Sequence, residues 1–272
     1  MNIASGDFDF IRDLIRRRSA IVLEPGKEYL VESRLGAVAR EEGFASLEHL
    51  VTELRTRPSN GLHRRVVEAM TTNETTFFRD IHPFDALRQA ILPELIERRA
   101  SQRQLTIWCA ACSSGQEPYS ISMLLREHFP ALTGWTVRIV ATDLSGEMLE
   151  RARSGRYSQL EVNRGLPASY LVKYFRKQGL EWQLAEEVRR MVEYRELNLN
   201  EPWPGVPPAD LVFLRNVLIY FDVETKRSIL AKVRRVLRPD GYLFLGGSET
   251  TMGLDDTYQR MPVGKAVCYR PS

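Results

Sequence analysis

Residues 105–120 read LTIWCAACSSGQEPYS and contain the most informative pattern for the fold. Residues 105–110 form a short apolar run, which predicts a buried strand. A loop of small side chains follows at 110–115, and a helical pattern extends from about 116 to 128. A strand, a loop of small residues and a helix in this order are typical of an α/β fold whose loop backbone approaches a ligand closely.

Strand and helix patterns alternate through the rest of the C-terminal part. The further strand patterns lie at 136–143, 210–220, 242–247 and 265–270. Ser145 and Asp222 are expected to cap the helices that follow two of them, and residues 238–241 are expected to form a turn. This alternation predicts an α/β protein with a mainly parallel, Rossmann-like sheet that is covered by helices on both faces.

Residues 158–197 do not fit the alternation. The run WQLAEEVRRMVEYREL (182–197) is compatible with one helix. It is also compatible with short antiparallel strands that follow a turn at Gly179. We expect a small antiparallel β insertion on the parallel core at about 158–197.

The first seventy residues show only helical patterns. Apolar residues recur at three- and four-residue spacing in 8–23, 27–42, a segment after Ser46, and 62–70. Asp7 is an expected N-cap, and Pro58 to Gly61 has the composition of a turn. We therefore expect a small helical domain at 1–70, a linker at 71–82, and the sheet domain at 83–272.

Composition excludes several classes of protein. The net charge of +3, with 27% charged residues, is too balanced to favour a nucleic-acid-binding protein. The sequence has no apolar run of about 20 residues, and the N-terminus carries acids where a signal peptide has basic residues, so we expect a cytoplasmic protein without membrane insertion. Cys109 and Cys112 form a C-x-x-C motif, which is found in zinc sites and in redox-active cysteine pairs. Without a second such pair or a nearby histidine, ordinary reduced thiols and no bound metal are favoured.

The carboxyl ends of the first two strands are the expected ligand site. The loop at 110–115 is neither G-x-G-x-x-G nor a P-loop, which weakens dinucleotide and ATP binding. Asp143 ends the second strand, where an acid either binds ribose hydroxyls or caps the next helix. Glu117 either offsets a helix dipole or binds an ammonium group. Together with 237–242, these features resemble the Rossmann-like S-adenosylmethionine methyltransferases.

Three segments resemble the chemotaxis receptor glutamate O-methyltransferases of the CheR family. They are TTNETTFFR (71–79), GQEPYS (115–120) and RNVLIYF (215–221), and their order and spacing match across nearly the whole chain. The resemblance implies a protein-glutamate O-methyltransferase that uses S-adenosylmethionine, yields S-adenosylhomocysteine and modifies chemoreceptors for sensory adaptation. It also implies that the linker contributes to the active site and that the helical domain docks the helical cytoplasmic domain of the receptor.

The same resemblance assigns roles to individual residues. The implied cofactor ligands are Asn73, Thr75, Arg79, Glu117, Asp143, Asn198, Leu199, Arg215 and Asn216. Arg79 and Tyr220 are implied to be catalytic, near the transferred methyl group. Arg34 and Arg40 match positions that contact the receptor, although they also fit a solvated helix face with Glu41 and Glu42 nearby.

Two departures from the family pattern affect these expectations. The first loop often reads Thr-Gly-Glu-Glu in the family but Ser-Gly-Gln-Glu (114–117) here, and Glu117 retains the acid at the ligand position. Residues 176–193 are shorter than in members that bind a pentapeptide at the receptor C-terminus. We therefore expect an enzyme that works without this tether.

The chemistry implied by the resemblance needs no general base. A free glutamate has a pKa of about 4.3, so its carboxylate is already the nucleophile at neutral pH. Two alternatives stay open: a methyltransferase acting on a small molecule or RNA, and a non-enzymatic module that senses the cofactor or binds regulators. The segments 71–79 and 215–221 argue against the first, and the complete set of implied cofactor ligands argues against the second.

Overall fold

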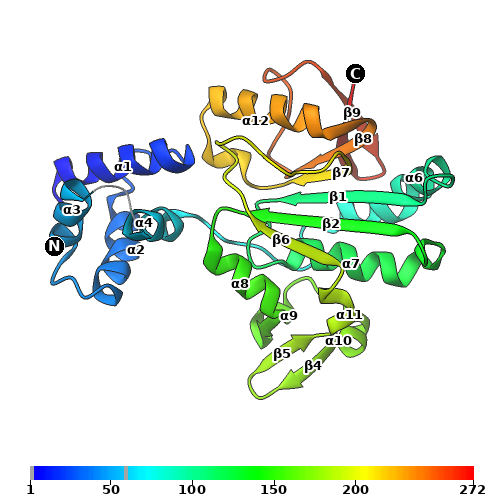
Figure 1. Ribbon diagram of the computed structural model, residues 1–272, viewed down its shortest axis with the longest axis horizontal. Helices are drawn as coiled ribbons and strands as arrows, with labels where there is room; N and C mark the ends of the chain where they lie inside the picture. Colours follow the sequence, from blue (N-terminus) through cyan, green and yellow to red (C-terminus); the bar gives the residue numbers. More distant parts are fainter. Residues whose placement is uncertain (1–2, 58–60) are drawn as a thin grey trace.

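The N-terminal part of the molecule is a bundle of helices. The computed structural model describes residues 3–57 and 61–272, and the bundle lies to one side of a larger lobe (Figure 1). Its helices are α1 (Ser5–Ser19), α2 (Glu28–Glu41), α3 (Leu47–Thr56) and α4 (Gly61–Met70). They enclose a core of their own, which includes Ile11, Ile15, Val31, Leu35, Leu50 and Val66. The helical character predicted for this part is confirmed.

The N-cap that the sequence predicted for the first helix of the bundle is wrong. Ser46, after which a helix was expected, caps α3 by accepting a hydrogen bond from the His49 N–H. Asp7 does not cap α1, because the helix starts earlier with Ala4 at its N-cap. The Asp7 carboxylate lies in the first turn and pairs with Arg55 at 2.9 Å. The turn expected at 58–61 lies mostly outside the described residues.

An extended linker leads to a helical run that is not uniform. The run consists of α5 (His82–Ala86), a π-helical turn η1 (Leu87–Ile91) and α6 (Leu92–Arg98). Pro93 has no N–H to donate to the preceding turn, so the helix widens into a π-turn just before it.

The described residues form a seven-stranded sheet at the centre of the larger lobe. Its strands are β1 (Gln104–Ala110), β2 (Thr136–Asp143), β6 (Val192–Glu196), β7 (Ala209–Leu214), β8 (Leu237–Leu245), β9 (Tyr258–Val263) and β10 (Ala266–Pro271). Their order is β6-β2-β1-β7-β8-β10-β9. The first five are parallel, and β10 runs antiparallel to both of its neighbours. The predicted mainly parallel, Rossmann-like sheet is confirmed.

Helices cover both faces of this sheet. On one face lie α7 (Gln116–His128) and α8 (Gly146–Ser154), and on the other lies α12 (Val223–Val236) (Figure 1). Alternate residues of β1 enter different cores: Ile107 packs with the α7 side, whereas Trp108 packs with the α12 side. Short 3₁₀ turns lie at η2 (Pro130–Leu132) and η3 (Leu218–Tyr220). Ser145 and Asp222 cap α8 and α12 as predicted.

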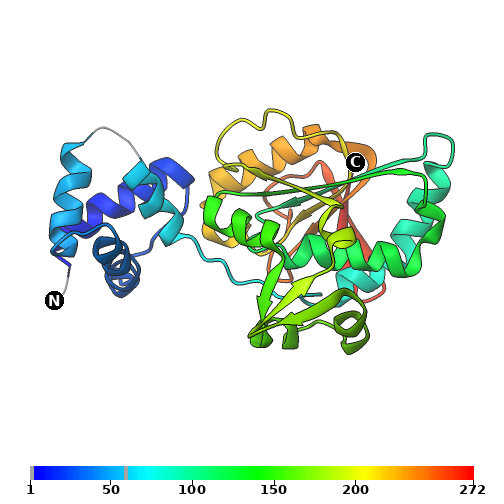
Figure 2. The same ribbon diagram turned by 60° about the horizontal axis from the view of Figure 1, so that its bottom comes forward.

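A second, smaller sheet follows α8. It is antiparallel, in the order β3 (Arg156–Ser158), β5 (Glu181–Leu184), β4 (Phe175–Gln178), and Figure 2 shows it below the main sheet. The helices α9 (Gln159–Asn163), α10 (Ala168–Tyr174) and α11 (Glu186–Arg189) complete this subdomain. The alternative of one helix over 182–197 is therefore wrong. The last strand of that region, β6, does not join the small sheet but pairs in parallel with β2.

Two features near the C-terminus were not predicted correctly. Residues 238–241 belong to β8 rather than to a turn, although they bulge, since Ala209 pairs with Leu237 and Leu211 with Tyr242. The bulge is pinned by Arg99, which bonds Asp210 at 2.8 Å and Asp240 at 2.6 Å. Edge strand β9 was not predicted.

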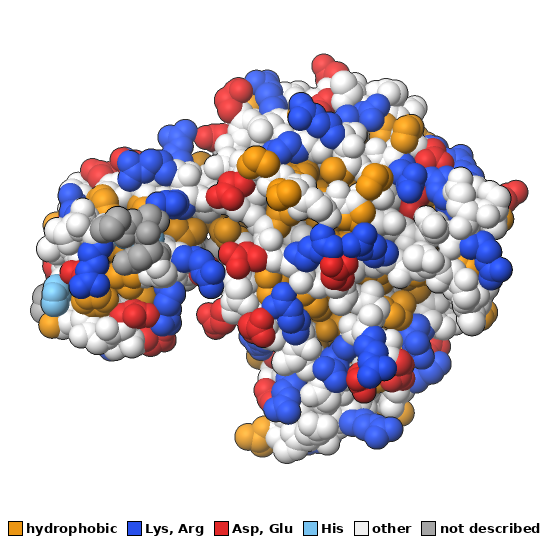
Figure 3. All heavy atoms as spheres, in the orientation of Figure 1, with side chains coloured by type: hydrophobic (Ala, Val, Ile, Leu, Met, Phe, Trp, Pro, Cys, Tyr) orange, Lys and Arg blue, Asp and Glu red, His pale blue; other side chains and the backbone are white. Residues whose placement is uncertain are grey.

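The two lobes meet at the carboxyl ends of β1, β2 and β7. Figure 3 shows a notch between them, with basic and acidic side chains interspersed over the face in view. Among residues 3–57 and 61–272, none of the helices has the length and apolar character that crossing a bilayer requires.

Candidate functional site

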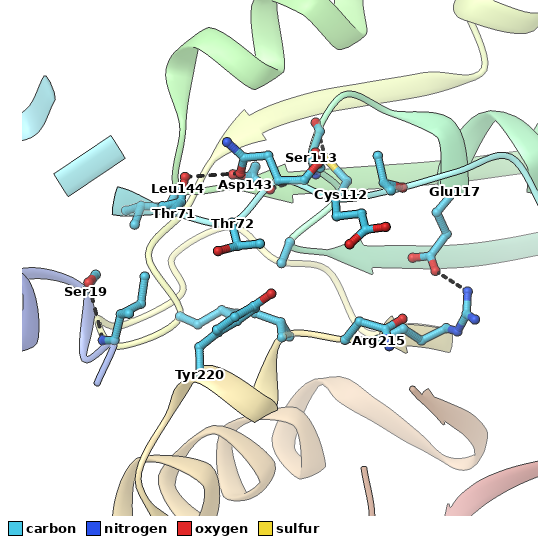
Figure 4. A pocket seen from close by; sticks show the side chains of 18 of the residues that line it. Ser19, Thr71, Thr72, Cys112, Ser113, Glu117, Asp143, Leu144, Arg215 and Tyr220 are labelled. Carbon is cyan, nitrogen blue, oxygen red and sulfur yellow. Dashed lines mark hydrogen bonds and ion pairs between the residues drawn. The ribbon is translucent and has the colours of Figure 1, made fainter. Parts of the chain in front are cut away.

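A cavity opens where the parallel strands end and the helical bundle meets the larger lobe. The space between its lining residues, counted out to the open mouth, is about 900 Å³. Ten residues singled out in the sequence line it: Asn73, Thr75, Arg79, Glu117, Asp143, Asn198, Leu199, Arg215, Asn216 and Tyr220. Figure 4 shows side chains from several of these segments around the common space. The structure thus brings residues more than 140 positions apart into one site.

The loop after β1 forms one wall through its backbone. Ala111 and Ser113 have φ values of +54° and +50°, an unusual conformation for residues other than glycine. The Ser113 N–H donates to Asp143 Oδ2 at 2.7 Å, and the Ser113 hydroxyl donates to the Asn73 carbonyl at 2.9 Å. These bonds fix the loop to the end of β2 and to the interdomain linker.

Asp143 holds two loops rather than the helix that follows it. Its Oδ1 accepts the Ser145 N–H at 2.9 Å, while the Ser145 hydroxyl itself caps α8. The carboxyl group is buried, which raises its pKa, and hydrogen bonds from the backbone N–H groups of Ser145, Ser113 and Leu144 act in the opposite direction. Each carboxylate oxygen has a second lone pair for a ligand in the cavity.

Arg215, at the end of β7, is the most deeply buried charge of the site. Its side chain is 2% exposed and pairs with Glu117 at 2.9 Å. The other end of the guanidinium donates to the Arg79 carbonyl at 2.8 Å and to Asp80 at 2.9 Å. Burial raises the pKa of the Glu117 carboxyl, and the charge of Arg215 opposes that rise.

Because Glu117 forms an ion pair with Arg215, only part of its carboxylate can bind an ammonium group. Oε2 of Glu117 is occupied by Arg215, whereas Oε1 forms no hydrogen bond with any described residue. A cation in the cavity would therefore share this carboxylate with Arg215. Such sharing suits a group that bears both an ammonium and a carboxylate, because Arg79 lies on the same cavity wall.

Arg79 and Tyr220 enter the cavity from different directions. Arg79 is half-buried and donates to the Glu74 carbonyl at 2.8 Å. It lies in a tight turn in which Phe78, Asp80 and Ile81 all have positive φ. Tyr220 points into the cavity from η3 (Figure 4). A guanidinium and a phenol on one cavity can both donate hydrogen bonds to an anionic guest.

The helical bundle contributes a wall that the sequence did not reveal. Ser19 and Ile21, at and after the end of α1, line the cavity. The Val22 N–H donates to the Tyr220 carbonyl at 2.9 Å, and Asn198 donates to the Arg18 carbonyl at 2.6 Å. These bonds join segments about 180 or more residues apart, and no local sequence signal identifies them.

The two arginines proposed for docking lie outside this cavity and differ from each other. Arg34 donates to the Met70 and Thr71 carbonyls at 2.9 and 2.7 Å, so it holds the end of α4 and the linker. Arg40 is exposed and has no ion-pair partner among the described residues. Glu41 and Glu42 do not balance it, because both pair with Arg65.

The cysteines of the C-x-x-C are buried and unpaired. Cys109 lies inside β1, and Cys112 lies in the loop beside the cavity. Burial raises the pKa of both thiols, which keeps them protonated at neutral pH.

Comparison with known proteins identifies methyltransferases that are similar to this chain over nearly its whole length. Residues 6–71 match the family described as "CheR methyltransferase, all-alpha domain", and residues 73–267 match "CheR methyltransferase, SAM binding domain". Chemotaxis protein methyltransferase 1 of Pseudomonas aeruginosa is 46% identical over 274 residues, covering 99% of each chain. A Pseudomonas putida chemotaxis protein methyltransferase, Cher2, is 42% identical with the same coverage, and one from Vibrio parahaemolyticus is 38% identical, covering 96% of this chain and 95% of its own.

Proposed function

This chain belongs to the CheR family of chemotaxis methyltransferases, and we propose that its cavity aligns the cofactor with a glutamate side chain of a chemoreceptor. The protein is an S-adenosylmethionine-dependent methyltransferase that modifies chemoreceptors in chemotaxis. The observation that carries the proposal is the convergence of ten family-matched residues on one cavity. The named relatives favour a protein acceptor over a small molecule, RNA or a non-enzymatic module.

The residues of the cavity fit such a cofactor. The buried carboxylate of Asp143 suits ribose hydroxyls, and the buried Oδ1 of Asn216 lacks a hydrogen-bond partner among the described residues. Glu117, Arg215 and Arg79 provide charges of both signs for an amino acid end group. Asn73, Thr75, Asn198 and Leu199 complete the proposed cofactor site.

The proposed chemistry needs orientation rather than a proton acceptor. When bound, the cofactor supplies an electrophilic methyl group on a positively charged sulfur. The incoming glutamate is ionised at neutral pH, so it needs no base. Arg79 would orient the carboxylate by charge-assisted hydrogen bonds, and Tyr220 would donate a second bond or shape the pocket. Because charge is neutralised along the reaction, a moderate grip on the carboxylate serves catalysis better than a tight one.

A groove beside the cavity offers a path for the receptor. It lies between the helical bundle and α12, and Tyr220 lines both the groove and the cavity. Val22, Ile219 and Val223 expose apolar surface there. The charged side chains that line it are the basic Lys27, Arg34 and Lys226 and the acidic Glu24 and Asp222, which leaves an excess of one positive charge. This mixture suits a receptor helix with acidic and apolar residues, with Arg40 making a further contact on α2.

Substitution of Asp143 by alanine is expected to weaken cofactor binding by about tenfold or more, since a ribose acceptor is lost. It should also lower the free energy of unfolding by about 1–3 kcal/mol, because buried N–H groups of the flanking loops lose their partner. Calorimetric titration with S-adenosylmethionine and thermal unfolding measure the two effects. Asp143→Asn, which keeps one acceptor oxygen, is the control, and unaltered affinity in the alanine variant would remove Asp143 from the ribose role.

Reversal of charge at Arg40 is expected to raise the KM for receptor by about three- to tenfold at low salt, with less effect at high salt, because an exposed charge acts mainly through screened attraction. The kcat and the cofactor Kd should not change. Methylation of receptor-bearing membranes over a range of receptor concentrations measures this. Arg17→Glu makes the same charge change on α1, where no docking is proposed. Equal KM values for the two variants would exclude Arg40 from docking.

We further propose a cytoplasmic enzyme that needs no receptor C-terminal tether. The hairpin expected to bind such a tether consists of the four-residue strands β4 and β5, joined at Gly179. Receptors with and without their last five residues should therefore be methylated at equal rates. A clear loss of rate with the truncated receptor would show that the small sheet binds the peptide.

A further inference from the structure

Glu249, which no sequence motif singled out, lies under the loop that joins β7 to η3. That loop carries Arg215 and Asn216 into the cavity, and η3 carries Tyr220. Oε2 of Glu249 accepts the Asn216 N–H at 2.7 Å and the Gly246 N–H at 2.6 Å. One carboxylate oxygen thus ties the start of the loop to the end of β8.

The other oxygen of the same carboxylate holds the end of the loop and the 3₁₀ turn η3 that follows it. Oε1 accepts the Val217 N–H at 2.9 Å and the Ile219 N–H at 3.3 Å. Ile219 lies within η3 and directly precedes Tyr220, so the carboxylate also holds the turn that carries Tyr220. A carboxylate is acceptor-only when ionised, and here four backbone donors meet its two oxygens.

The loop adopts a left-handed backbone conformation at Asn216. Asn216 has a φ of +58°, which is unfavourable for most residues other than glycine. Gly246 is packed against it so closely that an added Cβ would lie 2.7 Å from Asn216 Nδ2 and 2.7 Å from Glu249 Oε2. Gly246 therefore leaves room for the Asn216 side chain and the Glu249 carboxylate, and a larger residue at this position would displace one of them.

We propose that Glu249 is a positioning residue that pre-organises Asn216 for the cofactor and Tyr220 for the methyl acceptor through four backbone N–H groups. This role rests on the proposed function of the cavity and adds a group outside it. Glutamine at this position would place an amide NH₂ against two N–H donors, whichever way the side chain were turned.

The test compares Glu249→Gln with Glu249→Asp and with a matched control, Glu161→Gln. Glu161 also accepts a backbone N–H, that of Ser158 at 2.8 Å, but it lies in the small sheet subdomain. Receptor methylation gives kcat and KM, and calorimetry with S-adenosylmethionine gives the Kd and the binding stoichiometry.

For Glu249→Gln we expect kcat to fall and the cofactor Kd to rise, each by about 10–100-fold, with a stoichiometry of one site per chain, since a displacement of about 1 Å is enough for such a loss. Glu249→Asp should recover part of the loss, and Glu161→Gln should stay within about twofold of the original chain. Unchanged kcat and Kd in folded Glu249→Gln, or a loss proportional to the fraction of chains that bind, would overturn the proposal. Failure of the unsubstituted chain to methylate receptors would instead count against the proposed function, and the Kd arm would still decide the role of Glu249.

Discussion

Replacement of Arg79 by alanine is expected to lower the kcat of methyl transfer by about 10²–10³-fold, the usual cost of removing one pre-organised donor from an active site. The guanidinium is half-buried on the cavity wall and is the donor proposed to orient the glutamate carboxylate. Its main-chain carbonyl accepts the bond from Arg215, and alanine keeps that bond. The measurement is the initial rate with labelled S-adenosylmethionine at saturating cofactor and receptor.

Two further variants make this result specific. Arg79→Lys keeps the charge but loses the planar fork of donors, so it should recover only part of the rate. Arg88→Ala removes an arginine from η1 that pairs with Asp85 and does not line the cavity, and its rate should be unchanged. Because Arg79 is also a proposed cofactor ligand, the Kd is measured alongside. A kcat of Arg79→Ala within about threefold of the original value would contradict a catalytic role.

Replacement of Arg215 by methionine is expected to lower the free energy of unfolding by about 3–5 kcal/mol and to abolish measurable cofactor binding. Breaking a buried ion pair from one side leaves the other charge without compensation, and Glu117 is that charge here. The same change releases Asp80 and the Arg79 carbonyl. Urea denaturation followed by circular dichroism gives the loss of stability.

The double variant with Glu117→Gln separates the ion pair from the rest of the network. If the uncompensated carboxylate causes the loss, neutralising it should restore part of the stability. Arg138→Met removes one side of an exposed pair with Glu193 and should cost less than about 1 kcal/mol. A cost at Arg215 no larger than that at Arg138 would show that the buried pair does not hold the site together.

The parts of the fold that the sequence predicted are those with strong local patterns. The apolar run of β1 and the small-residue loop after it identified the core unit, and Ser46, Ser145 and Asp222 identified helix starts. Strand β9 has no such pattern, since it is an edge strand with several exposed residues and a proline, Pro262. Strand β6 belongs to the main sheet because it pairs with β2, about fifty residues earlier in the chain. The local hydrophobic pattern does not encode this pairing.

The residues of the cavity also fall into those that the sequence indicated and those that only the folded chain brings there. Local chemistry pointed to the loop at 110–115, Glu117 and Asp143. Family resemblance supplied Asn73, Thr75, Arg79, Asn198, Leu199, Arg215, Asn216 and Tyr220. Neither source indicated Ser19 or Ile21, because they reach the cavity only when the bundle packs against the larger lobe. Arg34 illustrates the reverse case: its side chain is largely committed to the carbonyls of Met70 and Thr71, which the helical pattern of α2 could not show.

The proposal that the cavity delivers a methyl group to an acidic side chain is tested most directly by chemical analysis of the product. Receptor-bearing membranes are incubated with the protein and S-adenosylmethionine labelled in its methyl group, and the receptor is then treated with alkali. We expect label to be transferred to the receptor and released by alkali as volatile methanol, because carboxyl methyl esters hydrolyse in base. Label that stays on the receptor after alkali, or that never reaches the receptor although the cofactor binds, would contradict it.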